Sequence, residues 1–308
     1  MLPNYKTALV VAALNVLLRL PSFVSASRLR PVYIIGHMVN SISEIDAAMR
    51  QKANSIESDV AFDKNGNATW FYHGIPCDCF RTCTSWENVP TFLQYIRQST
   101  HPNGGKHREK LLMLFLDLKV QKLDNKKKYW AGTDVATKLL QHLWQGVPPT
   151  QAMNVLVSVP SYRDKDVLRG AIDTIKRHAP AMLAKTGFDI SDIEDLSKIR
   201  SVYQELGIRE NRWQGDGAQN CFSFLRSHSR MRRVVANRDL NSADHYVDKA
   251  YHWTVDIPDQ LRRSLRIGVD GIITNKPERL ASIVTEREFR SKLRRATIDD
   301  NPWTRFRA

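Results

Sequence analysis

Short runs of branched aliphatic residues recur along the chain and alternate with longer amphipathic stretches. Continuous Val, Ile and Leu runs are typical of parallel strands that helices cover on both faces. This alternation predicts an α/β protein with one domain, an irregular (β/α)8 TIM barrel, and a doubly wound open sheet is the structural alternative. The expected strands are 32–35, 55–62, 69–72, 110–118, 154–159, 208–213, 233–236, 251–255 and 271–274, and the clearest expected helices are 42–52, 86–98 and 133–144.

The N-terminal 26 residues have the pattern of a secretory signal peptide. Lys6 gives a basic head, residues 8–18 form an apolar run, and Val24-Ser25-Ala26 offers small residues for cleavage. The run is short for a membrane span and no later stretch is long and apolar enough for one, so an uncleaved anchor is the weaker alternative. We therefore expect a signal peptide at 1–26 and a secreted, extracellular domain at 27–308, which is 282 residues of the 308.

The chain carries a formal net charge of +14, with basic residues scattered in short clusters such as Lys126-Lys127-Lys128. A solvated basic surface is the simplest explanation of this charge, and attraction to an anionic membrane surface is the sharper one. No known nucleic-acid-binding module accompanies the charge, so we do not expect nucleic acid as a partner.

Four cysteines follow the predicted leader: Cys77, Cys79, Cys83 and Cys221. An even number in a secreted chain favours disulfides. A Cys77–Cys79 bridge would close a very tight ring, which leaves Cys77–Cys83 with Cys79–Cys221, or Cys79–Cys83 with Cys77–Cys221. The C-x-C-x3-C spacing is poor for zinc. On the same secretory route, Asn67-Ala68-Thr69 is a candidate N-glycosylation site.

Polar residues capable of chemistry lie at the ends of the first four expected strands. Glu57 and Asp59 are two residues apart on one strand, so both side chains point to the same face, and Asp117 ends another strand. In a barrel these strand ends line one mouth, where active sites are built. Three carboxylates that converge there favour a hard cation, Mg²⁺ or Ca²⁺, and Lys119 could hold a phosphate oxygen.

Two histidines, His37 and His73, each follow an apolar strand and precede a break in the pattern. A lone histidine is more often a packing residue, but one neutral imidazole can accept a proton while a protonated one donates to a leaving oxygen. With the carboxylates beside them, the pair predicts metal-assisted cleavage of a phosphodiester.

At these residues the chain resembles the arachnid sphingomyelinase D/phospholipase D family, the dermonecrotic toxins of spider venoms and their tick, mite and scorpion relatives. The matching segments appear in family order and cover nearly all of residues 27–308. They include Ile35-Gly-His-Met-Val-Asn40, Tyr72-His-Gly-Ile-Pro-Cys-Asp-Cys79, Asp117-Leu-Lys119, Trp253-Thr-Val-Asp256, Thr274-Asn275 and Ala296-Thr-Ile-Asp-Asp-Asn-Pro-Trp303.

The resemblance implies a role for each matching residue. His37 and His73 match the catalytic histidines, and Glu57, Asp59 and Asp117 match the ligands of one Mg²⁺ ion. Lys119, Trp253, Asp256 and Asn275 match residues of the head-group pocket. Cys77–Cys83 and Cys79–Cys221 match the bridges of the two-disulfide subclass, and 296–308 matches a tail that closes the barrel floor. Departures at Ser58, Gly215 and His252 indicate a relative outside the main spider toxins, such as a tick, mite or scorpion member.

The reaction that the resemblance implies is transphosphatidylation. A hydroxyl of the lipid itself attacks phosphorus, choline leaves, and a cyclic phosphate remains, which is chemically reasonable because the internal nucleophile is already close. We expect a monomer that acts on sphingomyelin and related lysophospholipids at a bilayer surface. A glycerophosphodiester phosphodiesterase and a non-catalytic secreted lipid-binding protein are the alternatives.

Overall fold

The computed structural model of the protein describes residues 29–75, 77–79, 81–191 and 193–307. The predicted signal peptide at 1–26 lies outside the described residues. Within them, no helix is long and apolar enough to cross a membrane.

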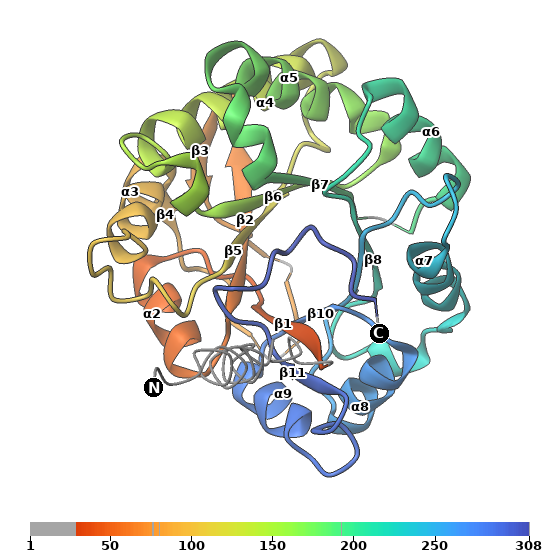
Figure 1. Ribbon diagram of the computed structural model, residues 1–308. Helices are drawn as coiled ribbons and strands as arrows, with labels where there is room; N and C mark the ends of the chain where they lie inside the picture. The colour runs from red at the N-terminus through yellow and green to blue at the C-terminus, as the bar shows by residue number, and fades with distance from the viewer. Residues whose placement is uncertain (1–28, 76, 80, 192, 308) are drawn as a thin grey trace, which may run out of the picture.

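The central feature is a barrel of parallel strands, seen along its axis in Figure 1. Neighbouring strands follow the order β7-β6-β5-β2-β1-β10-β9-β8, and a parallel bridge between Phe188 and Arg212 joins the two ends of this path. The barrel prediction is therefore confirmed, and the open-sheet alternative is wrong. The barrel strands are β1 (Arg30–Gly36), β2 (Ser55–Phe62), β5 (Met113–Leu118), β6 (Asn154–Val159), β7 (Thr186–Ile190), β8 (Trp213–Gly217), β9 (Lys249–Trp253) and β10 (Gly271–Thr274).

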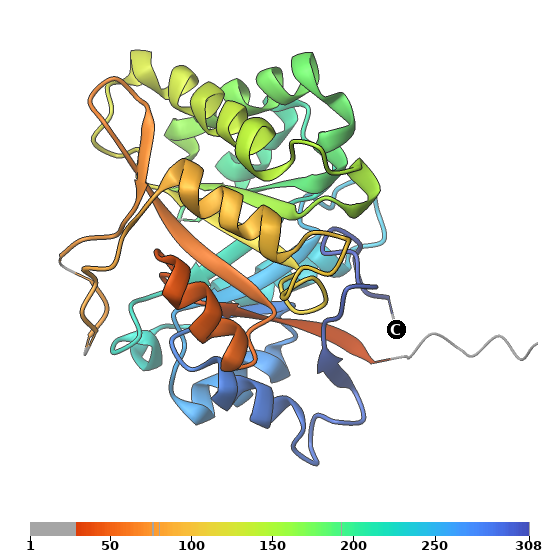
Figure 2. The same cartoon turned by 90° about the vertical axis from the view of Figure 1, so that its left-hand side faces the viewer.

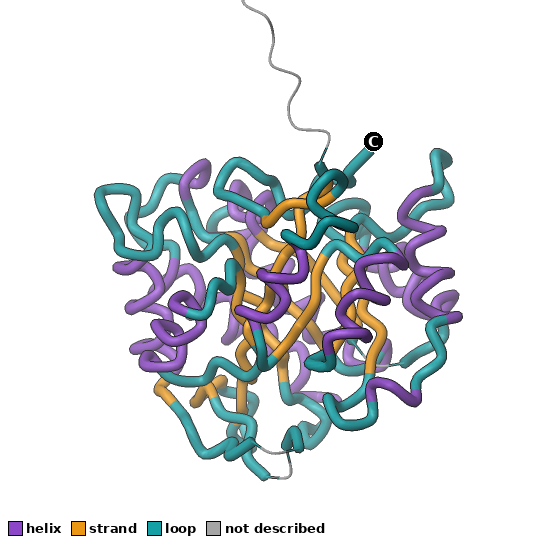
Figure 3. Tube along the Cα trace, turned by 90° about the horizontal axis from the view of Figure 1, so that it is seen from below, coloured by secondary structure: helices purple, strands orange, loops and turns teal. Residues whose placement is uncertain are grey.

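Helices surround the strands, as Figure 3 shows, and loops gather at the two ends of the barrel. Their boundaries follow ordinary capping chemistry. Ser41 caps the first by accepting from the Glu44 amide, and Gly268 ends α8 at φ 99°, a left-handed conformation that suits glycine. The α-helices are α2 (Ile42–Arg50), α3 (Val89–Ser99), α4 (Asn125–Lys138), α5 (Lys165–His178), α6 (Leu196–Leu206), α7 (Ser229–Asp239), α8 (Pro258–Ile267) and α9 (Pro277–Val284). A π-helical turn (Leu139–Leu143) and 3-10 turns at Pro149–Gln151, Tyr162–Asp164, Pro180–Lys185 and Ser223–Leu225 complete the set.

The third expected strand is not part of the barrel. β3 (Ala68–Phe71) turns back along β2 as an antiparallel hairpin and pairs on its other side with β4 (Glu87–Asn88). His73 thus follows a hairpin strand, and the next barrel strand after β2 is β5. Our prediction that His73 ends a parallel strand is wrong, because a parallel neighbour needs a crossover that the short 63–67 connection cannot supply.

Two other predicted strands are wrong, and one barrel strand was not predicted. Residues 233–236 were expected as a strand but lie within α7, where Arg230, Met231, Val234 and Arg238 are buried at helical spacing. The strand expected at 208–213 begins only at Trp213, and the preceding barrel strand, β7, is absent from the predicted set.

The core has two parts. The larger cluster lies between the outer faces of the strands and the helices. The smaller one fills the barrel and includes Tyr33, Phe115, Trp213 and Tyr251. The C-terminal tail contributes Trp303 to this inner cluster and so packs against the barrel floor, beside β11 (Leu293–Arg295), which pairs with β1.

Candidate active site

The three predicted carboxylate ligands meet at one end of the barrel. Asp59 on β2 is directly opposite Asp117 on β5 in the strand register, and one oxygen from each of Glu57, Asp59 and Asp117 lies within 4.8 Å of the others. This is the end that carries the cysteine loop, opposite the start of β1 and the C-terminal tail, as Figure 2 shows. The period of two along β2 is what brings Glu57 and Asp59 to the same face.

The electrostatics of this cluster fit a bound cation. Burial raises the pKa of Glu57 to about 8, and the charges of Asp59 and Asp117 act in the same direction. A carboxyl group whose pKa is raised this far lacks enough positive charge nearby to stabilise its ionised form. The oxygen-only donor set of Glu57, Asp59 and Asp117 is of the kind that Mg²⁺ and Ca²⁺ prefer.

Lys119 supplies part of the missing charge. Its ammonium lies 2.8 Å from Asp59 Oδ1 and 2.5 Å from Asp117 Oδ2. Burial would lower the pKa of Lys119, but the surrounding carboxylates raise it above its usual value, so the side chain stays charged. Asn40 holds Asp59 from the other side, since its amide donates to Asp59 Oδ2 at 2.8 Å and accepts from the Asp59 backbone N–H.

His37 reaches the same place from the end of β1. Its Nε2 lies 3.9 Å from Glu57 Oε2 and 3.3 Å from Thr254 Oγ1, while its Nδ1 lies 2.9 Å from Asp78 Oδ2. Burial would lower the pKa of His37, but the hydrogen bond to Asp78 and the charge of Glu57 raise it above the ordinary value. A carboxylate on Nδ1 fixes the ring and its tautomer, and leaves Nε2 directed toward the carboxylate cluster.

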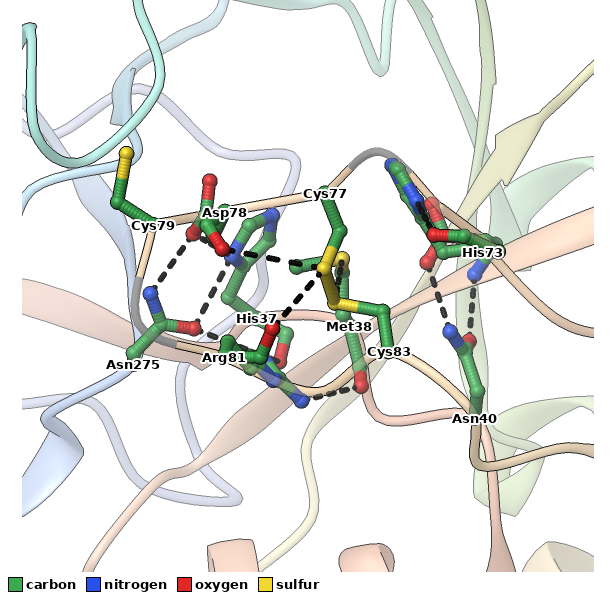
Figure 4. Close-up of a disulfide and its surroundings, with 12 residues drawn as sticks. His37, Met38, Asn40, His73, Cys77, Asp78, Cys79, Arg81, Cys83 and Asn275 are labelled. Atoms are coloured by element: carbon green, nitrogen blue, oxygen red, sulfur yellow. Dashed lines mark hydrogen bonds and ion pairs between the residues drawn. A yellow bond between two sulfur atoms is a disulfide. The ribbon is translucent and has the colours of Figure 1, made fainter.

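His73 lies on the opposite side of the Cys77–Cys83 bridge from His37 in the view of Figure 4. Its Nδ1 is 3.0 Å from the carbonyl oxygen of Gly74, and its charge contributes to the lowered pKa of Asp59, which Lys119 lowers more strongly against the effect of burial. His73 is therefore close to the carboxylate cluster, although it comes from the 72–86 loop and not from a barrel strand.

The loop that carries Asp78 is fastened by both disulfides. The structure contains Cys77–Cys83 and Cys79–Cys221, the pairing that the family resemblance implied. Arg81 adds further ties, because its guanidinium donates to the carbonyl oxygens of His37 and Met38 at 2.6 and 2.7 Å (Figure 4). These contacts hold the loop against the end of β1.

The predicted pocket residues divide into two groups. Trp253 borders a cavity of about 180 Å³ together with His37, Glu57, Asp117 and Lys119. The second group consists of Asn275 and Asp256. The Asn275 side-chain amide donates to Asp78 Oδ2 at 2.8 Å and to Asp256 Oδ2 at 2.9 Å. In this arrangement Asn275 and Asp256 support the His37–Asp78 pair and do not border that cavity.

Four residues of this site were missing from the prediction: Asp78, Arg81, Asn40 and Thr254. Asp78 could have been identified from the sequence, because a carboxylate between two disulfide-bonded cysteines is fixed in position together with their loop. Asn40 and Arg81 act through contacts between distant segments, which no local spacing reveals. The glycosylation candidate Asn67 lies apart, at an exposed turn where its amide donates to Asp63.

The chain is similar to a group of known proteins over nearly its whole length. A family model described as dermonecrotic toxin SPH matches residues 27–303. The chain is 46% identical to dermonecrotic toxin SPH of the tick Ixodes scapularis over 91% of this chain and 77% of that protein. It is 41% identical to dermonecrotic toxin Hl-PLD1 of the scorpion Hemiscorpius lepturus over 90% of this chain and 85% of that one. A toxin of the spider Loxosceles sabina is 42% identical over 89% of this chain and its own full length.

Solved structures with a similar fold include phosphodiesterases. A glycerophosphoryl diester phosphodiesterase described as putative, from Silicibacter pomeroyi, superposes with a TM-score of 0.55 at 15% identity, covering 86% of this chain and 96% of that one. Another such protein, from Galdieria sulphuraria, has a TM-score of 0.54 at 13% identity, covering 84% and 100%. At such identities the likeness concerns the fold alone.

Proposed function

Because this chain belongs to the dermonecrotic toxin SPH family, we propose that it is a metal-dependent phospholipase D that removes the head group of sphingomyelin and related lysophospholipids. The observation that supports this most directly is the convergence of Glu57, Asp59 and Asp117. Glu57 and Asp117 border a cavity of about 180 Å³ together with Lys119 and His37. That volume suits a phosphodiester head group and not a whole lipid, so the acyl chains stay outside the barrel.

In this proposal Glu57, Asp59 and Asp117 would hold one Mg²⁺ ion. Such an ion stabilises the negative charge that builds on the phosphorus oxygens. Lys119 binds a nonbridging oxygen of the same phosphate as a fixed point charge, since two carboxylates already hold its ammonium in place.

His37 and His73 divide the proton transfers between them. The hydroxyl oxygen of the lipid forms a bond to phosphorus, and its proton passes to one imidazole. The bond from phosphorus to the choline oxygen breaks, and that oxygen takes a proton from the other imidazole. The products are a cyclic phosphate and free choline, with no water consumed. Asp78 holds the His37 ring through Nδ1, and Trp253 forms one wall for the head group.

The same proposal covers the surroundings of the enzyme. The predicted leader at 1–26, two disulfides and the toxin relatives support secretion, with the substrate met at a bilayer surface. We also propose that the chain acts as a monomer.

The test is turnover of sphingomyelin liposomes followed by phosphorus NMR, with and without a chelator. We expect a cyclic phosphodiester resonance that disappears with the chelator and returns with Mg²⁺. Turnover of glycerophosphocholine but of no intact phospholipid would instead favour the glycerophosphodiesterase alternative.

His37→Ala and His73→Ala separate an enzyme from a lipid-binding protein. Both variants should bind sphingomyelin liposomes as the parent chain does and show no product. If liposome binding is the only measurable activity of the parent chain, the catalytic proposal is wrong.

A further inference from the structure

Trp253 borders a second, smaller cavity besides the one proposed for the head group. This cavity offers about 20 Å³ of space, and among its lining residues are His228, His252, Gln260 and Ser264. A single water molecule needs about 10–15 Å³ of such space. The cavity is therefore large enough for one water and too small for an organic ligand.

The tautomer of His252 follows from its neighbour. The hydroxyl of Ser264 donates its only proton to the carbonyl oxygen of Gln260 at 2.9 Å, so Ser264 Oγ can only accept from His252 Nδ1, which lies 2.8 Å away. His252 therefore carries its proton on Nδ1, and its Nε2 presents a lone pair. Burial lowers the pKa of His252 to about 3, which keeps the ring neutral.

Three further polar atoms around this cavity are buried and have no hydrogen-bond partner among the described residues. They are Trp253 Nε1, His228 Nε2 and Gln260 Oε1. Trp253 Nε1 can only donate, whereas Gln260 Oε1 and His252 Nε2 can only accept. Gln260 acts on the pKa of His228, so its amide lies beside that ring. A group that accepts from Trp253 Nε1–H and donates to the acceptors that remain would satisfy this set.

A metal ion does not suit the cavity. Burial lowers the pKa of His228, and the charges of Arg263 and Arg232 lower it further, while Arg226 acts on His252 in the same direction. A positive potential of this kind repels a cation. In addition, Asp216 is already paired with Arg226.

From this geometry we infer that the cavity binds one structural water, which accepts from Trp253 Nε1–H and donates to His252 Nε2 and to His228 or Gln260. Through this water, His252 and His228 are positioning residues that fix the indole of Trp253. The inference rests on the proposed function only in assigning Trp253 to the head-group pocket, since the water site itself follows from the cavity and its polar atoms.

The first experiment detects the water without any turnover. In a chain labelled with ¹⁵N at the indole nitrogens, and with Trp253→Phe used for assignment, we expect a cross-peak between Trp253 Nε1–H and a bound water. His252→Phe should remove the cross-peak, whereas His252→Gln should keep it, because the Gln carbonyl can accept in place of Nε2. No water cross-peak in the parent chain would overturn the inference.

The second experiment measures the effect on the head-group pocket. Loss of the water-mediated contact to the indole in His252→Phe should raise KM for sphingomyelin about fivefold and leave kcat within about twofold of the parent. His252→Gln should restore the KM of the parent. His178→Phe, at the exposed end of α5, is the matched control and should leave both constants unchanged. Thermal unfolding of each variant separates this effect from misfolding.

The two experiments distinguish failure of the water-site inference from failure of the proposed function. A cross-peak that disappears in His252→Phe with no change in KM would contradict the positioning role. If the parent chain turns over no phospholipid, the proposed function is wrong, while the NMR result still decides whether the water site exists.

Discussion

Single side chains decide the chemistry of this site, and Asp78 is the clearest case. It holds His37 through a 2.9 Å contact to Nδ1, and it is itself held by the amide of Asn275. Burial would raise the pKa of Asp78, but the hydrogen bond and charge of His37 lower it below the ordinary value, so the pair is ionic.

Asp78→Asn should keep the ring in place and remove the charge, because an Asn carbonyl can still accept from Nδ1–H. We expect the pKa of His37 to fall, since the negative group that raises it is gone, and kcat to fall about a hundredfold. A histidine NMR titration and sphingomyelin turnover measure the two effects. Asp259→Asn, at an exposed position on α8, is the control, and an unchanged pKa of His37 in Asp78→Asn would contradict the argument.

At this scale the sequence predicted the charged residues better than their neighbours. Glu57 and Asp59 could be assigned to one face from the period of the strand alone, and the structure brings both together with Asp117. The amide of Asn40 and the guanidinium of Arg81 could not be placed, because each acts across a contact that only the closed fold creates.

Among the elements, β7 shows why some strands escape prediction. Its sequence, Thr186–Ile190, contains glycine and aspartate and has no branched aliphatic run, yet the whole strand is buried. Gly187 is there for space, since a Cβ at this position would lie 2.3 Å from Cζ3 of Trp303. By contrast, β2, β6 and β10 are continuous apolar runs or clear alternations, and their predicted bounds match the structure.

Gly187→Ala should therefore destabilise the protein through the tail. We expect a loss of about 1–3 kcal/mol in the free energy of unfolding, the usual cost of overpacking. The same change in a Trp303→Ala background should cost much less, because the clashing ring is absent. Chemical denaturation of the four chains in this cycle measures the coupling, and equal costs in both backgrounds would contradict the packing argument.

Asp46 on α2 ties three segments together on the outside of the barrel. It accepts from Tyr95 on α3 at 2.5 Å and lies 2.7 Å from His107 Nε2 and 2.9 Å from Lys106 Nζ. Burial would raise the pKa of Asp46, but the hydrogen bonds from Tyr95, His107 and Lys106 hold it well below its usual range.

A carboxylate whose pKa is lower in the folded state than in the unfolded state stabilises the fold above its unfolded pKa, and this contribution fades as pH falls. Asp46→Asn should thus lose about 1–2 kcal/mol of unfolding free energy at neutral pH. The difference from the parent should shrink below about pH 4. Urea denaturation at pH 7, 5 and 3 measures it, and a difference that grows on acidification would show that the sign is wrong.

For the whole molecule, the long disulfide matters most. Cys79–Cys221 joins positions 142 residues apart, from the loop after β3 to the segment after β8, and so encloses four of the eight barrel strands. Closing a loop of this length restricts the unfolded chain by about 4–5 kcal/mol in the chain-entropy model.

The double variant Cys79→Ser/Cys221→Ser should lower the free energy of unfolding by several kcal/mol. The double variant Cys77→Ser/Cys83→Ser should lower it less, because the bridge that it removes joins positions only 6 residues apart. Both double variants should lose most of their activity, because each releases the loop that carries Asp78. Denaturation curves and turnover of the two variants test this. Full activity in either one would mean that the remaining disulfide and Arg81 hold the loop without the bridge that was removed.

Barrel closure is the other property of the whole molecule, and here the prediction of a TIM barrel over an open sheet is confirmed. In the structure, closure depends on β7 meeting β8 at Phe188 and Arg212. This contact joins two short strands of weak pattern, so the sequence could predict the closed fold but not the strands that close it.

The position of Asp78 between bridged cysteines also bears on when the protein becomes active during its biosynthesis. In the reducing cytosol the four thiols stay unpaired, the loop is untethered, and the partner of His37 is not held in place. If the chain follows the proposed secretory route, we expect catalytic competence to arise only in the oxidising lumen of the endoplasmic reticulum, where both pairs can form. The cytosolic face of the producing cell's membranes would then be protected from the proposed lipase by the order of covalent events, without a separate inhibitor.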